Sequence, residues 1–432
     1  MNNRGKLWTL RYTLINVTYF AAFCTVHAYA AVFLLDSGFT NTEIGILLAV
    51  ANVLSALFQP LVAAVIDRQG FFTNRNVMMI CAGMIAGGAV VLLFAGSVKP
   101  VVFIVFTMMY MVQFTYMPVM TALNFEYQRG GAKIFYGLAR GLGSAGFAVT
   151  SAIIGTVVEN EGVRVLLYVT IAVMALHAVI VYFFRLPTEN ENAAIAENNV
   201  NIENEDVSSS EAQTKKETGT SNSEKKNNES SSIPEFIKRY PAFMLMLVAT
   251  VFLFFTHNML NDYLIQILRP LGGGESELGI ATFLAAVLEL PTMAVITLVS
   301  KKVSMKLMLV VAGVSFTVKA VIMLLAANIP VAYVSQAMQM LAYAVFIPAA
   351  AYYVSENIAE NDQVKGQAFV TSCFTLAGVF SSLVCGIVLD SLGVTEMLII
   401  GVAVSSLGTL LIMCAMKMSP KNAAKHKMSA SA

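Results

Sequence analysis

Residues 42–70 read TEIGILLAVANVLSALFQPLVAAVIDRQG. Because no charged residue occurs between Glu43 and Asp67, this segment can form an apolar helix. About 20 such residues cross the ~30 Å hydrocarbon core of a bilayer. Similar segments recur along the chain, at 10–35, 42–66, 76–96, 99–123, 134–158, 163–185, 241–267, 277–299, 304–327, 330–355, 366–389 and 394–416. The sequence therefore predicts an all-α membrane protein with twelve transmembrane helices.

The composition of the 432 residues supports a membrane protein, because 57% are apolar and only 12% are charged. Soluble domains are usually about 25% charged. Of the 26 acidic residues, eleven lie between Glu189 and Glu235, so few remain to cover a water-exposed surface elsewhere. These numbers exclude a soluble enzyme and a secreted disulfide scaffold. The net charge of +1 offers no basic surface, so we expect no nucleic acid as a partner.

The chain contains no motif for a cofactor or for catalysis. Its five cysteines all fall inside apolar runs, with no spacing that suggests a metal or redox site. A GxxxxGK[ST] phosphate-binding motif is absent, so ATP is not expected to supply energy. We therefore predict no metal, no cofactor and no enzymatic activity.

The twelve predicted spans fall into two groups of six. The stretch between them, from about Thr188, is rich in Asn, Glu and Ser and is too polar to form a packed core. We predict an N-terminal bundle at 1–187, a disordered cytoplasmic linker at 188–236, a C-terminal bundle at 237–418 and a cytoplasmic tail at 419–432.

Short motifs repeat between the two halves. The sequence EIGI at 43–46 recurs as ELGI at 277–280, and Gly137-x-Ala139 recurs as Gly366-x-Ala368. Two parallel six-helix repeats around a central cavity are typical of many secondary transporters.

The positive charges predict the topology. With the N-terminus inside, 22 of the 27 Lys and Arg residues lie on cytoplasmic segments, and three lie outside. Cytoplasmic loops of membrane proteins carry such an excess. We therefore expect a multi-pass protein of the cell membrane with both termini in the cytoplasm.

The residues from Thr42 to Gly70 resemble spans 2 and 3 of the major facilitator superfamily, and in particular its lactose-permease-like branch of oligosaccharide–proton symporters. Three more segments resemble spans 5, 8 and 11 of that branch, at 136–147, 286–291 and 365–393. The resemblance covers nearly the whole chain outside the linker. It implies two pseudo-symmetric six-helix bundles and proton-coupled symport.

Glu289 and Lys319 are predicted to lie deep within spans 8 and 9. A charged group in hydrocarbon costs about 2.5–3.5 kcal/mol on insertion scales, so such residues line a cavity or pair. The resemblance implies that Glu289 takes part in substrate and proton coupling and that Lys319 tunes the proton site. A Lys319–Glu289 ion pair is one hypothesis, and a purely structural role is the alternative. Asp262, near the outer end of span 7, is a further candidate for coupling.

The resemblance places the substrate-binding arginine of the branch on Arg140, whose planar fork suits hydroxyl or carboxylate groups. Its span 4 acid corresponds to Glu126 or Asn124, near the end of that span. Phe147 stands where the branch has a sugar-stacking tryptophan, and Gln339 and Ala342 stand where it has a histidine and a glutamate.

Two further roles come from residue chemistry. Tyr29 and Gln339 offer a ring and polar atoms to a sugar or a base. Asp67 and Arg68 lie in the loop between spans 2 and 3, where we expect them to hold a cytoplasmic gate through charge pairs.

The sequence thus favours symport of a proton with a small polar solute, such as an oligosaccharide, by a monomer in the lipid bilayer. Import of a nucleoside or another metabolite, and multidrug efflux by the same fold, stay open as alternatives. A non-transporting membrane sensor or scaffold is an alternative of another class.

The topology predicts which side of the membrane the linker occupies. A cysteine introduced by Ser221→Cys should react with a membrane-impermeant thiol reagent only after the cells are broken. The unsubstituted protein is the control for its own cysteines. Labelling of Ser221→Cys in intact cells would invert the predicted orientation.

Overall fold

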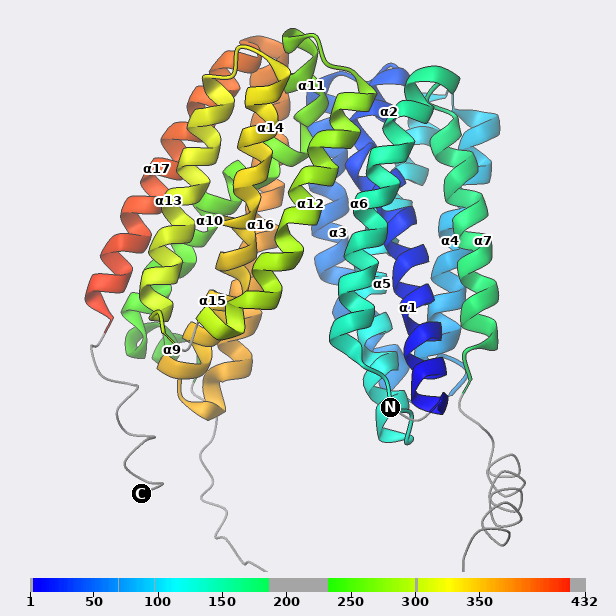
Figure 1. Cartoon of the computed structure of the whole chain (residues 1–432), viewed down its shortest axis with the longest axis horizontal. Helices are drawn as coiled ribbons and strands as arrows, with labels where there is room; N and C mark the ends of the chain where they lie inside the picture. Colours follow the sequence, from blue (N-terminus) through cyan, green and yellow to red (C-terminus); the bar gives the residue numbers. More distant parts are fainter. Residues whose placement is uncertain (1–2, 69, 97, 186–231, 300–301, 420–432) are drawn as a thin grey trace, which may run out of the picture.

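The computed structural model describes residues 3–68, 70–96, 98–185, 232–299 and 302–419, and within these ranges it contains helices and no strands. The helices form two bundles side by side (Figure 1). The N-terminal bundle consists of α1 (Asn3–Phe23), the π-helical turn η1 (Cys24–Ala28), α2 (Ala30–Asp36), α3 (Asn41–Asp67), α4 (Asn74–Ala95), α5 (Lys99–Arg129), α6 (Tyr136–Glu161) and α7 (Val165–Phe183).

The C-terminal bundle begins with a short helix and repeats the same arrangement. Its elements are α9 (Ile233–Arg239), α10 (Pro241–Asp262), α11 (Leu264–Leu268), η2 (Arg269–Leu271), α12 (Glu275–Val299), α13 (Met305–Leu324), α14 (Ile329–Ala337), η3 (Met338–Met340), α15 (Tyr343–Asn357), η4 (Glu360–Asp362), α16 (Gln363–Ser391) and α17 (Val394–Met418).

Each of the twelve predicted spans corresponds to a helix or a broken helix among the described residues, which confirms the fold class. Ten of these are long and apolar enough to cross a membrane, and the pair α1–α2, bent by 48°, makes eleven. The twelfth, α12, is 25 residues long and packs against α6.

The structure corrects several sequence-based boundaries. The helix α5 continues to Arg129, so Glu126 lies on it and not after it. The helix α9 begins at Ile233, inside the predicted linker, most of which lies outside the described residues. Three predicted spans are interrupted, at η1, at Tyr263 and at η3.

The two bundles meet at one end, which we call the closed end. There α3 crosses α16, and Gly45 lies against the carbonyl of Ser382. A side chain at Gly45 would collide with that oxygen and with the hydroxyl of Tyr263, which donates to the same carbonyl at 2.6 Å. One turn along α16, Gly386 lies against the carbonyl of Asn41.

A second crossing at the closed end joins α6 to α12 with the same construction. Gly279 lies against the carbonyl of Ser151, which accepts a 3.1 Å hydrogen bond from the hydroxyl of Tyr29. Gly155, one turn further along α6, lies against the carbonyl of Glu275.

The two crossings are copies of one contact. Tyr29 and Tyr263 are separated by 234 residues, as are Gly45 and Gly279. The backbones approach closely because glycine lacks a side chain, which is a common way to pack helices in a membrane. The repeat detected in the sequence at 43–46 and 277–280 is therefore part of the contact between the halves.

Asp390 strengthens the closed end. Its carboxylate accepts hydrogen bonds from the backbone N–H groups of Asn41 and Thr42, at 3.1 and 2.7 Å. These groups start α3, so the carboxylate of one bundle caps a helix of the other, where the helix dipole favours negative charge. Gln266 adds a 3.0 Å bond to the side chain of Asn41.

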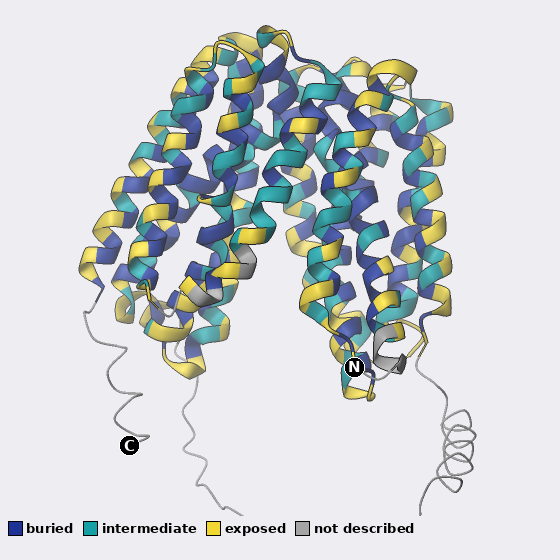
Figure 2. Cartoon of the chain, viewed as in Figure 1, coloured by how far each residue is buried: buried dark blue, intermediate teal, exposed yellow. Residues whose placement is uncertain are grey.

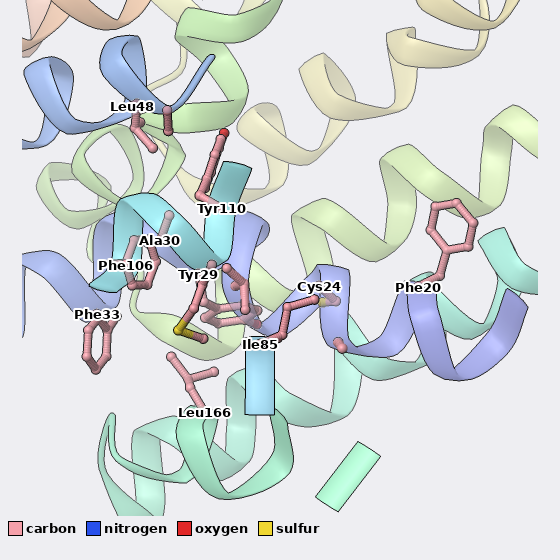
Figure 3. Packing of buried hydrophobic residues seen from close by; sticks show 14 of the residues in the cluster. Phe20, Cys24, Tyr29, Ala30, Phe33, Leu48, Ile85, Phe106, Tyr110 and Leu166 are labelled. Atoms are coloured by element: carbon pink, nitrogen blue, oxygen red, sulfur yellow. The ribbon is translucent and has the colours of Figure 1, made fainter. Parts of the chain in front are cut away.

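At the opposite end, which we call the open end, the bundles are apart (Figure 1). No hydrogen bond or ion pair links the two bundles there among the described residues. The buried apolar residues follow the same division (Figure 2). One cluster, part of which is seen in Figure 3, fills the N-terminal bundle and crosses to Tyr263 and Leu278 at the closed end. A separate cluster fills the rest of the C-terminal bundle.

The closed end predicts a test of its glycine contacts. Gly45→Val combined with Gly279→Val should force the bundles apart there, because overpacking costs about 1–3 kcal/mol per site. Spin labels are attached at Asp36→Cys and Leu392→Cys, both exposed at this end. Double electron–electron resonance should then report a longer distance between the two labels. Gly87→Val is the matched control, since a side chain there has open space. An unchanged distance in the double variant would contradict the proposed role of the glycines.

Candidate functional site

Glu289 lies midway along α12, half-buried, and its carboxylate interacts with groups from three other elements. The side chain of Gln339 and the charges of Lys319 and Arg140 all act on it. Lys319 and Gln339 belong to the C-terminal bundle and Arg140 to the N-terminal bundle. The carboxylate is therefore placed where both bundles contribute charge.

Lys319 on α13 is fully buried, and its ammonium donates a 2.6 Å hydrogen bond to Oε1 of Gln339. The sequence suggested a direct ion pair with Glu289. Within 4.0 Å the described residues form no such pair. Gln339 interacts with both charged groups instead: its side-chain carbonyl accepts from the ammonium, and its side chain also acts on the carboxylate.

The position of Gln339 depends on a break in the tenth span. The helix α14 ends at Ala337, a 3₁₀ turn covers Met338–Met340, and α15 begins at Tyr343. Broken helices at membrane depth are tolerated where the freed backbone lines a cavity or is buried in protein, and they form ion and substrate sites in transporters. The sequence gives no sign of this break, because no Gly or Pro occurs between Val331 and Phe346.

Arg140 lies in the second turn of α6 and is half-buried. Its guanidinium donates to the hydroxyl of Ser144 at 3.0 Å and stands 4.2 Å from the centroid of the Phe20 ring. Its charge also acts on Tyr343 of the C-terminal bundle. The charge of Arg140 therefore acts across the space between the bundles, and its guanidinium, which carries five donors, has donors beyond the one that bonds to Ser144.

Aromatic rings and imidazoles pack together within both bundles. Phe147 stands 6.3 Å from Phe23, which stacks at 3.9 Å on His27 in the π-helical turn η1. In the C-terminal bundle His257 stacks at 4.8 Å on Tyr343. π-Helical turns such as η1 often occur at functional sites. Nothing in the residues of η1 predicted this turn.

Four predicted residues are placed away from Glu289. The hydroxyl of Tyr29 is bonded at the closed end. Glu126 accepts a 2.7 Å hydrogen bond from Asn74 of α4. Asn124 is fully buried one turn from Gln128 and bonds to it.

The fourth, Asp262, ends α10 and interacts with Ser382 and Tyr110.

Asp67 and Arg68 end α3 at the open end, where both are exposed. Neither side chain takes part in an ion pair within the described part of the chain. Asp67 lines a cavity of about 760 Å³ between α3 and α5, together with Gln59 and Arg129.

Two bundles of six spans, joined at one end and separated at the other around buried charges, define a membrane transporter of the major facilitator class. The chain belongs to the MFS_1-like family, whose model matches residues 7–424. No curated protein matches the sequence.

Solved structures share the fold at low identity. A mutant of the nucleoside transporter NupG superposes with a TM-score of 0.73 at 12% identity, over 95% of this chain and 99% of that one. The D-xylose–proton symporter gives 0.68 at 14%, over 96% and 97%. A bacterial homologue of the human lysosomal transporter Spinster, solved inward-facing and unoccupied, gives 0.65 at 13%, over 96% and 98%.

The bridging role of Gln339 predicts a contrast with Gln336, which is also fully buried one turn earlier but has no partner for either polar atom of its amide. Gln339→Leu leaves the Lys319 ammonium without its acceptor and should lower stability by about 1–3 kcal/mol. Gln336→Leu removes two unsatisfied groups and should be neutral or stabilising. Thermal unfolding in detergent measures both, and an equal loss in the two variants would refute the bridge.

Proposed function

We propose that this protein is a proton-coupled symporter that imports a small polar solute across the cell membrane by alternating access. The observation that carries the proposal is the Glu289 carboxyl group, half-buried within a span and joined through Gln339 to the buried Lys319. A carboxyl group in this position can take up and release a proton as its surroundings change. The absence of any catalytic constellation in the sequence favours transport over catalysis.

The open end is assigned to the cytoplasm by the excess of Lys and Arg on the loops there. In this orientation the termini are cytoplasmic and the structure is inward-facing. The opposite state requires the two glycine crossings and the Asp390 cap to separate. Asp67 and Arg68, which form no ion pair with the described residues in this state, then form charge pairs that close the cytoplasmic end. The protein acts as a monomer, because each bundle supplies one side of the site.

Arg140 and Gln339 are proposed to bind the solute, because they act on Glu289 from opposite bundles. Phe147, whose ring lies near Phe23 in the N-terminal bundle, is proposed to stack on the solute. Tyr29 and Glu126 are given supporting roles, since their polar groups bond within the protein. Asn124 is given one as well, because its side-chain carbonyl accepts from Gln128. A saccharide fits the guanidinium and amide groups, and the similarity in fold to a xylose–proton symporter supports it. A nucleoside is the second candidate, because the stacked rings around His27 and His257 suit a planar base.

Two substitutions separate coupling from binding. Glu289→Gln keeps the size of the side chain but cannot carry a proton, so accumulation driven by a pH gradient should be lost. Exchange of solute across the membrane, which need not release the proton, should persist. Arg140→Lys keeps the charge but loses the fork, so affinity should fall about tenfold or more in both assays.

Proteoliposomes with and without an imposed pH gradient provide the measurement, with a solute found by uptake screening. The exposed Lys238→Gln serves as a control for reconstitution. Full uphill accumulation by Glu289→Gln would remove Glu289 as the proton carrier. Asp262 would then be the next candidate.

A further inference from the structure

The charges around Glu289 do not balance. Two cationic side chains, Lys319 and Arg140, act on this one carboxylate. For Lys319, Glu289 is the charged partner within the described residues. The site therefore carries one positive charge in excess when Glu289 is ionised and two when it holds a proton.

Asp262, a second acidic residue within the C-terminal bundle, is turned away from the site. Asp262 lies five residues beyond His257, the residue of α10 on which Lys319 acts. Five residues at 3.6 per turn rotate a side chain by ~140° and advance it by ~7.5 Å. Asp262 accordingly interacts with Tyr110 and Ser382 at the closed end. Glu126, bonded to Asn74 near the open end, is no closer substitute.

The excess charge comes with unused hydrogen-bond donors. An ammonium has three donors, and among the described residues Lys319 uses one, toward Gln339. The amide of Gln336, on the neighbouring span, is fully buried with both polar atoms unpaired. Arg140 keeps the part of its fork that does not bond to Ser144. Buried polar groups in native proteins normally form hydrogen bonds, so we expect a bound ligand to accept from these donors.

We propose that the transported solute carries a carboxylate, which binds between Arg140 and Lys319 and neutralises the excess positive charge. This inference rests on the proposed transport function and narrows its substrate to acidic solutes, such as a sugar acid. A carboxylate forms short, charge-assisted hydrogen bonds to an ammonium and to a guanidinium, and a guanidinium can donate two parallel hydrogen bonds to it. A neutral solute leaves the cationic pair unbalanced in the membrane.

One proton carried by Glu289 together with one monovalent anion moves no net charge. Accumulation is then driven by the pH gradient and is indifferent to the membrane potential. Symport of a proton with a neutral solute moves one positive charge and responds to both.

Matched solutes that differ by a carboxylate test the inference: lactobionate against lactose, glucuronate against glucose, and orotidine against uridine. Binding to the purified protein is measured by thermal unfolding, and uptake by proteoliposomes under an imposed pH gradient. We expect an acidic member to raise the unfolding temperature and to accumulate, while its neutral counterpart does neither. A potential imposed with valinomycin should leave this accumulation unchanged.

Variants locate the charge. Lys319→Gln and Arg140→Gln should each weaken binding of the acidic solute about tenfold or more, the value of one charge-assisted bond. Arg140 is half-buried beside the space between the bundles, so its replacement tests the site even if Lys319→Gln fails to fold. Lys238→Gln makes the same change at an exposed position and should bind as the unsubstituted protein does.

The outcomes separate this inference from the proposed symport. Binding of a neutral member as tight as that of its acidic partner, or binding of no acidic member, overturns the carboxylate assignment. If a neutral solute then accumulates with the pH gradient and requires Glu289, the symport stands alone. Binding of an acidic member that moves without regard to the pH gradient keeps the carboxylate site and overturns proton coupling.

Discussion

The 2.6 Å hydrogen bond from Lys319 to Gln339 is the interaction on which the site depends. A lysine placed in hydrocarbon costs about 2.5–3.5 kcal/mol on insertion scales, so it must be compensated inside the protein. Here the amide of Gln339 provides part of that compensation and at the same time acts on Glu289. Because the two charges are held apart by a neutral group, the carboxyl group can change its protonation state without breaking a direct ion pair. The remaining positive charge is left for a ligand.

The second constraint is the near-identity of the two bundles at the closed end. Tyr29 and Tyr263 each fix a carbonyl that a glycine of the opposite bundle then touches. Since the contacts are duplicated, the two halves can hinge about an axis between them, and both crossings tighten or loosen together. Contacts between small residues depend on close approach and are lost over a short distance. Such an interface suits two discrete states rather than a graded opening.

Much of the fold could be predicted from sequence, because hydrocarbon imposes a simple rule. Apart from a closed β-barrel, a bilayer can be spanned only by helices, in which the backbone groups bond to one another. Apolar runs of sufficient length therefore identify the spans directly. The ends of α3 and α17 accordingly lie within two residues of those predicted. The repeat of EIGI and ELGI also marked the residues that join the bundles, although the sequence could not reveal that contact.

The interruptions could not be predicted. The π-helical turn around His27 and the break beside Gln339 contain neither Gly nor Pro, so tertiary packing and not local preference determines them. The bridge between Glu289 and Lys319 follows from the second break and escaped prediction with it. The depth of Glu289 and Lys319 in the membrane could be predicted from their positions in apolar runs. The roles of Tyr29 and Glu126 could not, because they depend on hydrogen-bond partners that only the structure shows.

Infrared difference spectroscopy tests, without a substrate, whether Glu289 binds the transported proton as proposed. Purified protein in lipid is compared between alkaline and acidic buffer, and the C=O band of a protonated carboxyl group is followed. We expect this band to include a component that is lost in Glu289→Gln and retained in Asp262→Asn. A spectrum that is unchanged by Glu289→Gln would contradict it.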